Sequence, residues 1–193
     1  MKVAIVGAGL AGLSCAHELE RLGIKPVVYE KNSFIGDQIT HTSVLLEIIN
    51  RPIKDLIRYI KKEYYIEIMP LDTLNTLTHF SPNKKTVITG NLGYLIKRGN
   101  EKDSLFIQLL CQLKKTDFRM NEAPDPLTLS GEYDYVVIAN GTPSYTNELG
   151  CWQSWINMYL RGAVVLGSFD PHELKVWINK TYCKRGYAYM TPL

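Results

Sequence analysis

Apolar and polar positions follow two different periods at the N-terminus of the chain. A short apolar run rich in β-branched residues, 2–6, predicts a buried strand. Leucine and alanine then recur at helical spacing over 11–22, and Gly23 supplies a natural C-terminal stop for that helix. A second apolar run opens at Pro26 and ends at Glu30. The pattern therefore predicts a strand–helix–strand unit of about 30 residues.

The rest of the chain predicts helices at both ends of a β-rich stretch, followed by a late buried strand. Helices are expected over 43–49, 52–62 and 101–113, with Pro52 well placed at a helix start. Strands are expected over 65–69, 75–80, 85–89, 133–139, 163–169 and 174–179, with a turn at 81–84.

Composition and charge narrow the classes of protein. The 193 residues suffice for one domain or one and a fraction, with a sizeable core. A net charge of +3 does not favour nucleic acid, which usually needs a clustered basic face. No stretch approaches the roughly 18 apolar residues of a membrane span. Glycines interrupt the first apolar run, unlike a signal peptide, so we expect a cytoplasmic protein.

Cysteine and histidine spacing gives no metal motif. No two cysteines form a CxxC pair, and no histidine lies near them at ligand spacing. Isolated thiols in a reducing compartment are favoured over a metal site or a disulfide framework. We therefore expect no metal. The residues concerned are Cys15, Cys111, Cys151, Cys183, His17, His41, His79 and His172.

A glycine motif joins the first predicted strand to the first predicted helix. Gly7 permits a tight turn, Gly9 lets the backbone approach a pyrophosphate, and Gly12 lets the helix pack close to the strand. The helix N-terminus would offer free N–H groups and a positive dipole end to phosphates. The alternative is a glycine-rich turn without a ligand. The candidate cofactor-binding residues of this loop are Gly7, Ala8, Gly9, Leu10, Ala11 and Gly12.

An acidic residue ends the second predicted strand. Glu30 lies 18 residues after Gly12, where a carboxylate can accept hydrogen bonds from both ribose hydroxyls of a dinucleotide. The same carboxylate would repel a 2′-phosphate, which argues against NADP at this site.

The stretch 6–32, VGAGLAGLSCAHELERLGIKPVVYEKN, resembles the N-terminus of FAD-dependent oxidoreductases of the two-dinucleotide-binding-domain family. There the acid is followed by a basic or small residue, here Lys31, and by a short turn ending in glycine. The stretch 133–141, YDYVVIANG, is similar to the family's second strand signature, which ends in A-x-G. The resemblance implies that FAD is the cofactor and that Ala139 and Gly141 lie against it.

Two later stretches resemble flavin monooxygenases and geranylgeranyl reductases. In 95–110, LIKRGNEKDSLFIQLL, Arg98 matches an arginine that precedes a helix beside the cofactor; a solvated arginine is the alternative. The stretch 186–192, GYAYMTP, matches a G-Y-x-W-x-x-P segment of the substrate cavity, with Tyr189 in place of the tryptophan. Tyr187 and Tyr189 could orient a substrate or be cavity or core aromatics.

The resemblance implies a three-layer α/β fold, a Rossmann-like FAD/NAD(P)-binding domain with β-rich substrate-domain segments. The FAD-binding domain is expected over 1–150, with an inserted β-rich segment at about 64–96. The start of a substrate domain is expected over 151–193, in truncated form. The family's later Gly-Asp pair is not found, so the chain resembles the N-terminal half or so of a typical member, as a fragment or a shortened protein.

The resemblance implies an FAD-dependent oxidoreductase, with NAD(P)H as the electron donor and a small-molecule substrate, for which a lipid-like molecule is one candidate. The flavin itself performs the redox step, so no catalytic residue is assigned. A truncated noncatalytic nucleotide-binding module and an NAD-binding dehydrogenase fragment remain alternatives.

The stretch 51–62, RPIKDLIRYIKK, predicts a basic amphipathic helix. Such a helix can rest on an anionic membrane surface, or can cover a core with a solvated basic face. Its basic residues are Arg51, Lys54, Arg58, Lys61 and Lys62.

Overall fold

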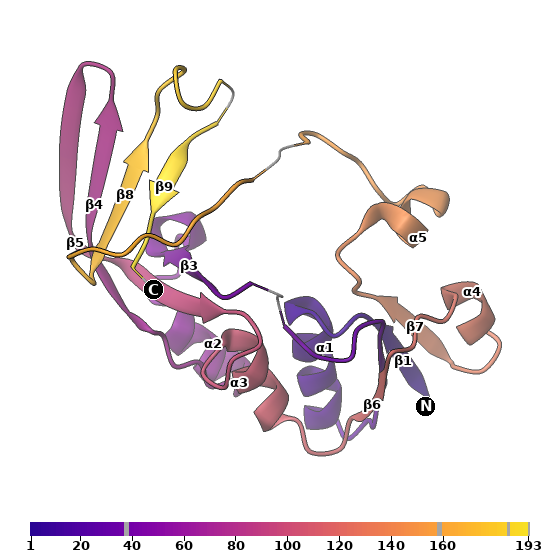
Figure 1. Cartoon of the computed structure of the whole chain (residues 1–193). Coiled ribbons are helices and arrows are strands. Elements are labelled where there is room, and N and C mark those ends of the chain that lie inside the picture. The colour runs from indigo at the N-terminus through magenta and orange to yellow at the C-terminus, as the bar shows by residue number, and fades with distance from the viewer. Residues whose placement is uncertain (37–38, 158–159, 185, 193) are drawn as a thin grey trace. The chain divides into compact units, whose positions relative to one another are not determined.

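The computed structural model describes residues 1–36, 39–157, 160–184 and 186–192. The chain forms two compact units (Figure 1). Unit 1 comprises Met1–Gly36 and Leu109–Gly167, and unit 2 comprises Asp37–Gln108 and Ser168–Leu193. Compact units are defined by contacts and not by function, so the functional domains expected over 1–150 and 151–193 stay a prediction.

The described part of unit 1 contains a four-stranded parallel sheet with the order β6-β2-β1-β7. The strands are β1 (Val3–Val6), β2 (Val27–Glu30), β6 (Asp117–Met120) and β7 (Tyr135–Ile138), and the helices are α1 (Leu10–Arg21), α4 (Pro126–Leu129) and α5 (Pro143–Glu148).

The core of unit 1 lies on both faces of this sheet. Gly12 of α1 packs against Ile5, which is fully buried, as is Leu13 of the same helix. Ala4 and Val6 point to the opposite face, since side chains alternate along a strand. There they cluster with Leu129 of α4. Helices therefore cover both faces, and the expected three-layer α/β arrangement is confirmed for this unit.

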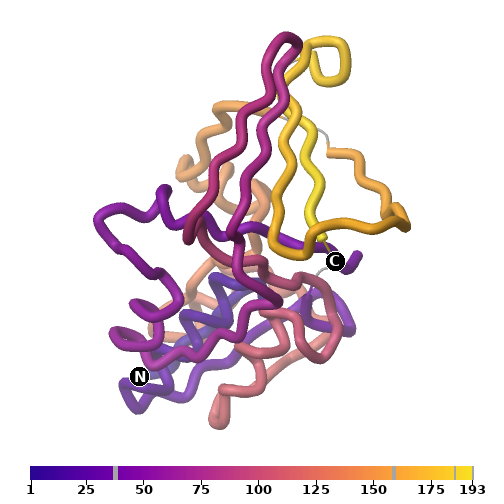
Figure 2. Tube along the Cα trace, turned by 90° about the vertical axis from the view of Figure 1, so that its left-hand side faces the viewer, coloured from indigo at the N-terminus to yellow at the C-terminus, as the bar shows by residue number. Residues whose placement is uncertain are grey.

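Unit 2 is built on a mixed sheet with the order β3-β5-β4-β8-β9 among the described residues. Figure 2 shows the long β4–β5 hairpin with β8 and β9 beside it. All of its strand pairs are antiparallel except β4 with β8. The strands are β3 (His41–Leu46), β4 (Asp72–Ser81), β5 (Lys84–Arg98), β8 (Glu173–Trp177) and β9 (Ala188–Met190), with η1 (Glu47–Asn50), α2 (Leu56–Tyr64) and α3 (Leu105–Gln112).

The core of unit 2 brings together segments that lie far apart in the sequence. Leu74 of β4, Leu95 of β5 and Leu174 of β8 form its buried cluster. Val44 and Leu46 of β3 pack against the same cluster. The boundary between the two units falls inside α3.

Several local predictions were wrong. Residues 43–49 were expected as a helix but form the end of β3 and most of η1, because Val44 and Leu46 are drawn into the core beside β5. The helix expected from Pro52 begins only at Leu56, where the Asp55 carboxylate accepts a hydrogen bond from the Arg58 amide at 2.9 Å.

Two expected strands are not formed, and other elements were not expected. Residues 65–69 are irregular, since Tyr65 ends α2 in the left-handed conformation. Residues 163–169 are likewise irregular and exposed. The elements that the sequence pattern did not predict are β3, β6, β9, α4 and α5.

Candidate functional site

The carboxyl ends of β1, β2 and β7 meet at one edge of the unit 1 sheet. The Gly7 amide donates a hydrogen bond to the Tyr29 carbonyl at 2.8 Å, and the Ala139 amide donates to the Val6 carbonyl at 2.8 Å. In open parallel sheets, ligands bind outside the carboxyl ends of the strands. The structure thus brings the glycine loop, Glu30 and the turn at Ala139 together, as a shared site requires.

Gly7 and Gly12 are required by the packing of the chain itself. Gly7 has φ +107°, and a Cβ atom there would lie 2.7 Å from the Ala139 carbonyl oxygen. A Cβ atom at Gly12 would collide with the Gly7 carbonyl oxygen. Any side chain at these two positions would therefore push the helix or the late strand away from β1.

Gly9 differs from both of these glycines. Its φ of −73° is open to any residue, and the nearest described atom to a Cβ built there is the Ala139 oxygen, at 3.9 Å. Neither the backbone conformation nor the packing of the described chain therefore requires glycine at this position. A glycine there does leave the backbone open to close approach by a ligand.

Helix α1 points its N-terminus at this edge. Its first residue is Leu10, and its N-cap is Gly9, which has no side chain to accept hydrogen bonds from the first amides. The first turn also carries no acidic residue. The positive end of the helix dipole and the first N–H groups are therefore left to other partners, and anions are the groups that they favour.

Glu30 is held in place by backbone amides. Its side chain is buried, with a relative exposure of 9%. One carboxylate oxygen, Oε2, accepts a hydrogen bond from the Ala8 amide at 2.9 Å, and the other, Oε1, accepts from the Asn32 amide at 2.9 Å. A carboxylate has about four acceptor positions, so capacity remains on both oxygens. Lys31, the next residue, is exposed.

The segment that follows β6 is hydrogen-bonded to the chain around Glu30, a contact that the sequence pattern did not predict. The Glu122 amide donates to the Glu30 carbonyl at 3.0 Å, and the Asn121 amide donates to the Asn32 carbonyl at 3.1 Å. Asn121 has φ +59°, a conformation that asparagine tolerates better than most residues. In the sequence, the end of β6 is marked only by an asparagine after a short stretch of mixed polar and apolar residues. That pattern is too weak to predict the end of a strand.

The turn after β7 carries a small network of polar side chains. The Asn140 amide nitrogen donates to the Ser144 hydroxyl at 3.1 Å, and its oxygen accepts from the Thr142 amide at 3.3 Å. The Thr142 and Ser144 hydroxyls lie 3.0 Å apart. Gly141 has φ +66°, which glycine adopts without strain. This network holds the Ala139–Gly141 turn, and the Ala139 carbonyl in turn packs against Gly7.

Arg98 belongs to unit 2 and lies at the end of β5. Its guanidinium carbon is 5.0 Å from the centre of the Phe106 ring, a cation–π contact between the strand and α3. Its expected place beside the cofactor stays a prediction. Tyr187 and Tyr189 lie together in unit 2, with ring centres 6.1 Å apart and both rings exposed, and their expected role toward a substrate also stays a prediction.

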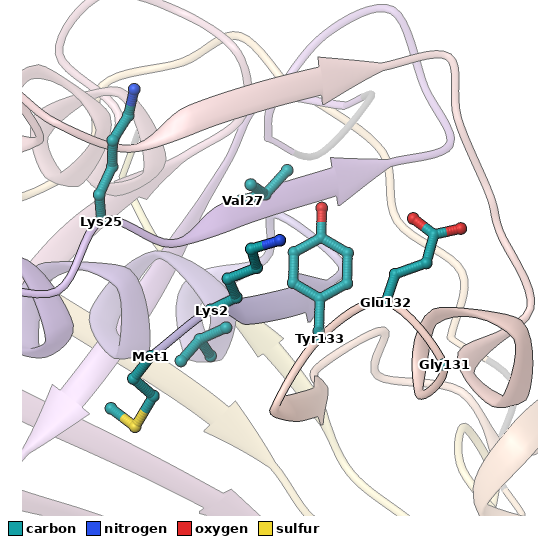
Figure 3. Close-up of a pocket in the computed structure, with 8 residues that line it drawn as sticks. Met1, Lys2, Lys25, Val27, Gly131, Glu132 and Tyr133 are labelled. Carbon is teal, nitrogen blue, oxygen red and sulfur yellow. The ribbon is translucent and has the colours of Figure 1, made fainter.

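A hollow of about 660 Å³ lies at the opposite edge of unit 1, at the amino ends of β1 and β2. Figure 3 shows Lys2 and Tyr133 beside each other along it. The Tyr133 hydroxyl is 2.8 Å from that of Tyr29. Burial of Tyr29 and this hydrogen bond raise its pKa to about 12. The hollow is separate from the glycine loop and contains none of the candidate residues.

Neither a metal cluster nor a membrane span is present in the described residues. Within them, no group of three or more histidine, cysteine or acidic side chains lies close enough to hold a metal ion. The helices described there are also too short or too polar to cross a bilayer.

Comparison with known proteins supports the fold. The family model of NAD(P)-binding Rossmann-like domains matches residues 5–65. A geranylgeranyl bacteriochlorophyll reductase-like protein from Thermoplasma acidophilum superposes with a TM-score of 0.64 at 15% identity, over 99% of this chain and 53% of that one. This likeness confirms the Rossmann-like α/β fold and the resemblance to the geranylgeranyl reductase group at the level of the fold.

Similarity to relatives of known function is confined to short segments. The NADPH glutamate synthase small chain of Halomonas elongata is 59% identical over 39 residues. The FAD-dependent monooxygenase idtM of Claviceps paspali is 60% identical over 38 residues. Each match covers 20% of this chain and 8% of the relative. The chain thus spans a small part of the length of these relatives and about half of the structural neighbour.

Proposed function

We propose that unit 1 binds the ADP part of FAD at the carboxyl ends of β1, β2 and β7, as part of a flavin-dependent oxidoreductase. The observation that carries the proposal is the pair formed by Gly9 and Glu30. Gly9 is a glycine that the described chain does not require, at the start of an uncapped helix. Glu30 is a buried carboxylate held by the Ala8 amide of the same loop.

Each group fits one part of an ADP moiety. The pyrophosphate would lie over Gly9 and accept hydrogen bonds from the first amides of α1. The Glu30 carboxylate, with its orientation fixed by the Ala8 and Asn32 amides, would accept from the ribose hydroxyls and disfavour a 2′-phosphate. The Ala139–Gly141 turn would lie beside the bound ADP moiety, since the Ala139 carbonyl already packs against Gly7 of the glycine loop.

FAD is proposed over NAD for two reasons. The A-x-G turn after β7 resembles the signature of FAD enzymes, and one relative is named as an FAD-dependent monooxygenase. When bound, the flavin supplies the redox chemistry, and the residues of unit 1 bind and orient its nucleotide end. The proposal also includes NAD(P)H as the electron donor and a small lipid-like substrate. It places Lys31 and Arg98 beside the cofactor, and the protein in the cytoplasm.

Retention of flavin tests this proposal. The purified chain is incubated with FAD, desalted, and examined for flavin absorbance in the visible range. Titrations with FAD, ADP and NAD⁺ then give the three dissociation constants. We expect flavin to survive desalting and FAD to bind more tightly than ADP. Equal affinities for FAD and ADP would favour a noncatalytic nucleotide-binding module, and tighter NAD⁺ binding would favour a dehydrogenase fragment.

Two matched variants make the test specific to the site. Gly9→Val places a branched side chain where the pyrophosphate would lie, and we expect it to weaken FAD binding by at least about tenfold, near 1.4 kcal/mol. Gly162→Val is the control, because no described atom lies within 4 Å of the Cβ position of Gly162. If both variants bind FAD as the unmodified chain does, the glycine loop is not the site.

A further inference from the structure

The polarity of the η1 turn in unit 2 is inverted. Glu47, which opens the turn, has a relative exposure of only 5%. The next two residues, Ile48 and Ile49, are apolar and have exposures of 72% and 74%. A surface turn ordinarily presents its charged residue to water and buries its isoleucines. The inversion means that two adjacent aliphatic side chains project from this part of unit 2.

Hydrogen bonds hold the inverted turn in this orientation. Both carboxylate oxygens of Glu47 accept from the Leu56 amide, at 3.3 and 3.2 Å, which ties the turn to the start of α2. The Asn50 side chain donates to the Leu46 carbonyl at 3.2 Å, and the Ile53 amide donates to the Asn50 carbonyl at 2.9 Å. The exposed isoleucines therefore lie on a turn that its own contacts fix.

Basic side chains follow this apolar tip along the chain. Arg51 and Lys54 are exposed, and the Arg58 side chain has an exposure of 85%. Between 48 and 58 the only acidic residue is Asp55, which caps α2 and accepts a hydrogen bond from the Tyr94 hydroxyl at 3.2 Å. Its carboxylate also forms an ion pair with Arg58 at 3.7 Å. The η1–α2 patch is defined as Ile48, Ile49, Arg51, Lys54 and Arg58.

We propose that the η1–α2 patch docks on the surface of an anionic lipid bilayer. Ile48 and Ile49 would enter the boundary between headgroups and acyl chains, and the three basic side chains would contact lipid phosphates. The three basic side chains of the patch are exposed, so its charge matches an anionic surface. This charge match favours an anionic lipid surface over a protein partner.

The lipid-facing residues differ from those that the helical pattern suggests. Ile53, Leu56, Ile57 and Ile60 form the apolar side of the predicted amphipathic helix, but all four are half-buried in unit 2. The exposed apolar side chains come instead from η1, before the helix begins. The proposal thus assigns the apolar contact to η1. The charged contact comes from Arg51 and Lys54, which precede α2, and from Arg58 within it.

Vesicle co-sedimentation of the full chain tests the proposal without reference to FAD. The probes are vesicles of phosphatidylcholine alone and vesicles that also contain phosphatidylglycerol. We expect the chain to sediment with the anionic vesicles and to remain in solution with the neutral ones. Raising the salt concentration should release it, because screening weakens exposed charges. A chain that stays in solution with both vesicle types overturns the proposal.

Paired variants assign the binding to the patch. We expect Ile48→Asp with Ile49→Asp, and Arg51→Glu with Lys54→Glu, each to lower the partition coefficient at least tenfold, since each basic side chain near a membrane is worth about fivefold. The matched controls are Val164→Asp with Leu166→Asp, and Lys84→Glu with Lys180→Glu, which alter exposed residues elsewhere.

The outcomes separate the patch from general charge or exposure. Unchanged binding of both control pairs, together with loss in both patch pairs, supports the proposal. An equal loss in a patch pair and its control shows non-specific binding and overturns it. Circular dichroism of every variant confirms folding, and Ile48→Ser with Ile49→Ser, expected to lower the partition coefficient at least tenfold, replaces the aspartate pair if that pair does not fold.

Discussion

The β1–α1–β2 segment of unit 1 and the sheet of unit 2 are specified by residues at very different separations along the chain. In unit 1, β1, α1 and β2 follow one another within the first 30 residues, and the glycine loop joins adjacent elements. In unit 2, β4 pairs with β8, and the Thr78 hydroxyl donates to the Glu173 carboxylate across a sequence separation of 95 residues. Local steric rules therefore govern the β1–α1–β2 part of the candidate site. Distant partners decide the sheet of unit 2 and also the Ala139 side of the site, which β1 meets by pairing with β7.

The largest expected loss of stability in unit 1 comes from adding a methyl group at Gly12. We expect Gly12→Ala to lower the free energy of unfolding by on the order of 3 kcal/mol or more, because its Cβ would collide with the Gly7 carbonyl. Gly9→Ala is the matched control and should leave stability within about 1 kcal/mol, since its Cβ has room. Urea unfolding of both variants measures the difference, and equal stability would refute the division of roles among the glycines.

A buried leucine in each unit tests whether the units unfold separately. We expect Leu13→Ala in α1 and Leu174→Ala in β8 each to cost about 2–4 kcal/mol, because both side chains are buried. Hydrogen exchange should then show lost protection mainly in β1, β2 and β7 for the first variant. For the second it should show loss mainly in β4, β5 and β8. Loss spread over all strands in both variants would mean that the units unfold together.

The smallest expected effect concerns the contact between α1 and the segment 114–116, which precedes β6. The Glu20 carboxylate accepts hydrogen bonds from the Thr116 hydroxyl and from the amides of Lys114, Lys115 and Thr116. Partial burial of Glu20 acts to raise its pKa, but these hydrogen bonds outweigh burial and hold the pKa below its usual value. We expect Glu20→Gln to cost about 1–2 kcal/mol at neutral pH.

The same contact predicts a pH dependence. Because the pKa of Glu20 is lower in the folded than in the unfolded chain, its stabilisation is complete above the unfolded value, near 4.5, and is lost as the pH falls through the folded value. Urea unfolding between neutral and acidic pH should therefore converge for the unmodified chain and the Glu20→Gln variant. Glu148→Gln serves as the control, since Glu148 is exposed and lies outside this contact. A constant difference down to low pH would contradict this account.

The part of the fold that sequence reasoning predicted is the part whose signals are local. Strand, helix and second strand were recognisable from β-branched residues, helical spacing and Gly7, Gly9 and Gly12. Their meeting with Ala139 follows from the parallel pairing of β1 with β7. For the candidate site, Glu30 could be expected from its place at the end of β2. The backbone amides that orient the Glu30 carboxylate could not be predicted, because every residue except proline carries such a donor and the sequence does not show which ones are used.

Predictions were wrong where distant contacts decide the structure. The run 43–49 has an apolar composition that suits a helix or a strand equally. Its pairing partner is β5, so Ser43 lies opposite Ile96 and the run forms a strand. The loop at Asn121 was missed for a related reason. Its importance comes from hydrogen bonds to Asn32 and Glu30, which belong to the second strand and the turn after it.

The interleaved connectivity of the units has a consequence for synthesis on the ribosome. After β2 has emerged, the chain leaves unit 1 for Asp37–Gln108 and returns only at Leu109. The β1–α1–β2 segment must therefore wait, with both strand edges unpaired, until β6 and β7 are made. Unit 2 waits longer still, since β8 begins at Glu173. The sheet of unit 1 is thus the first of the two to be completed as the chain is translated from its N-terminus.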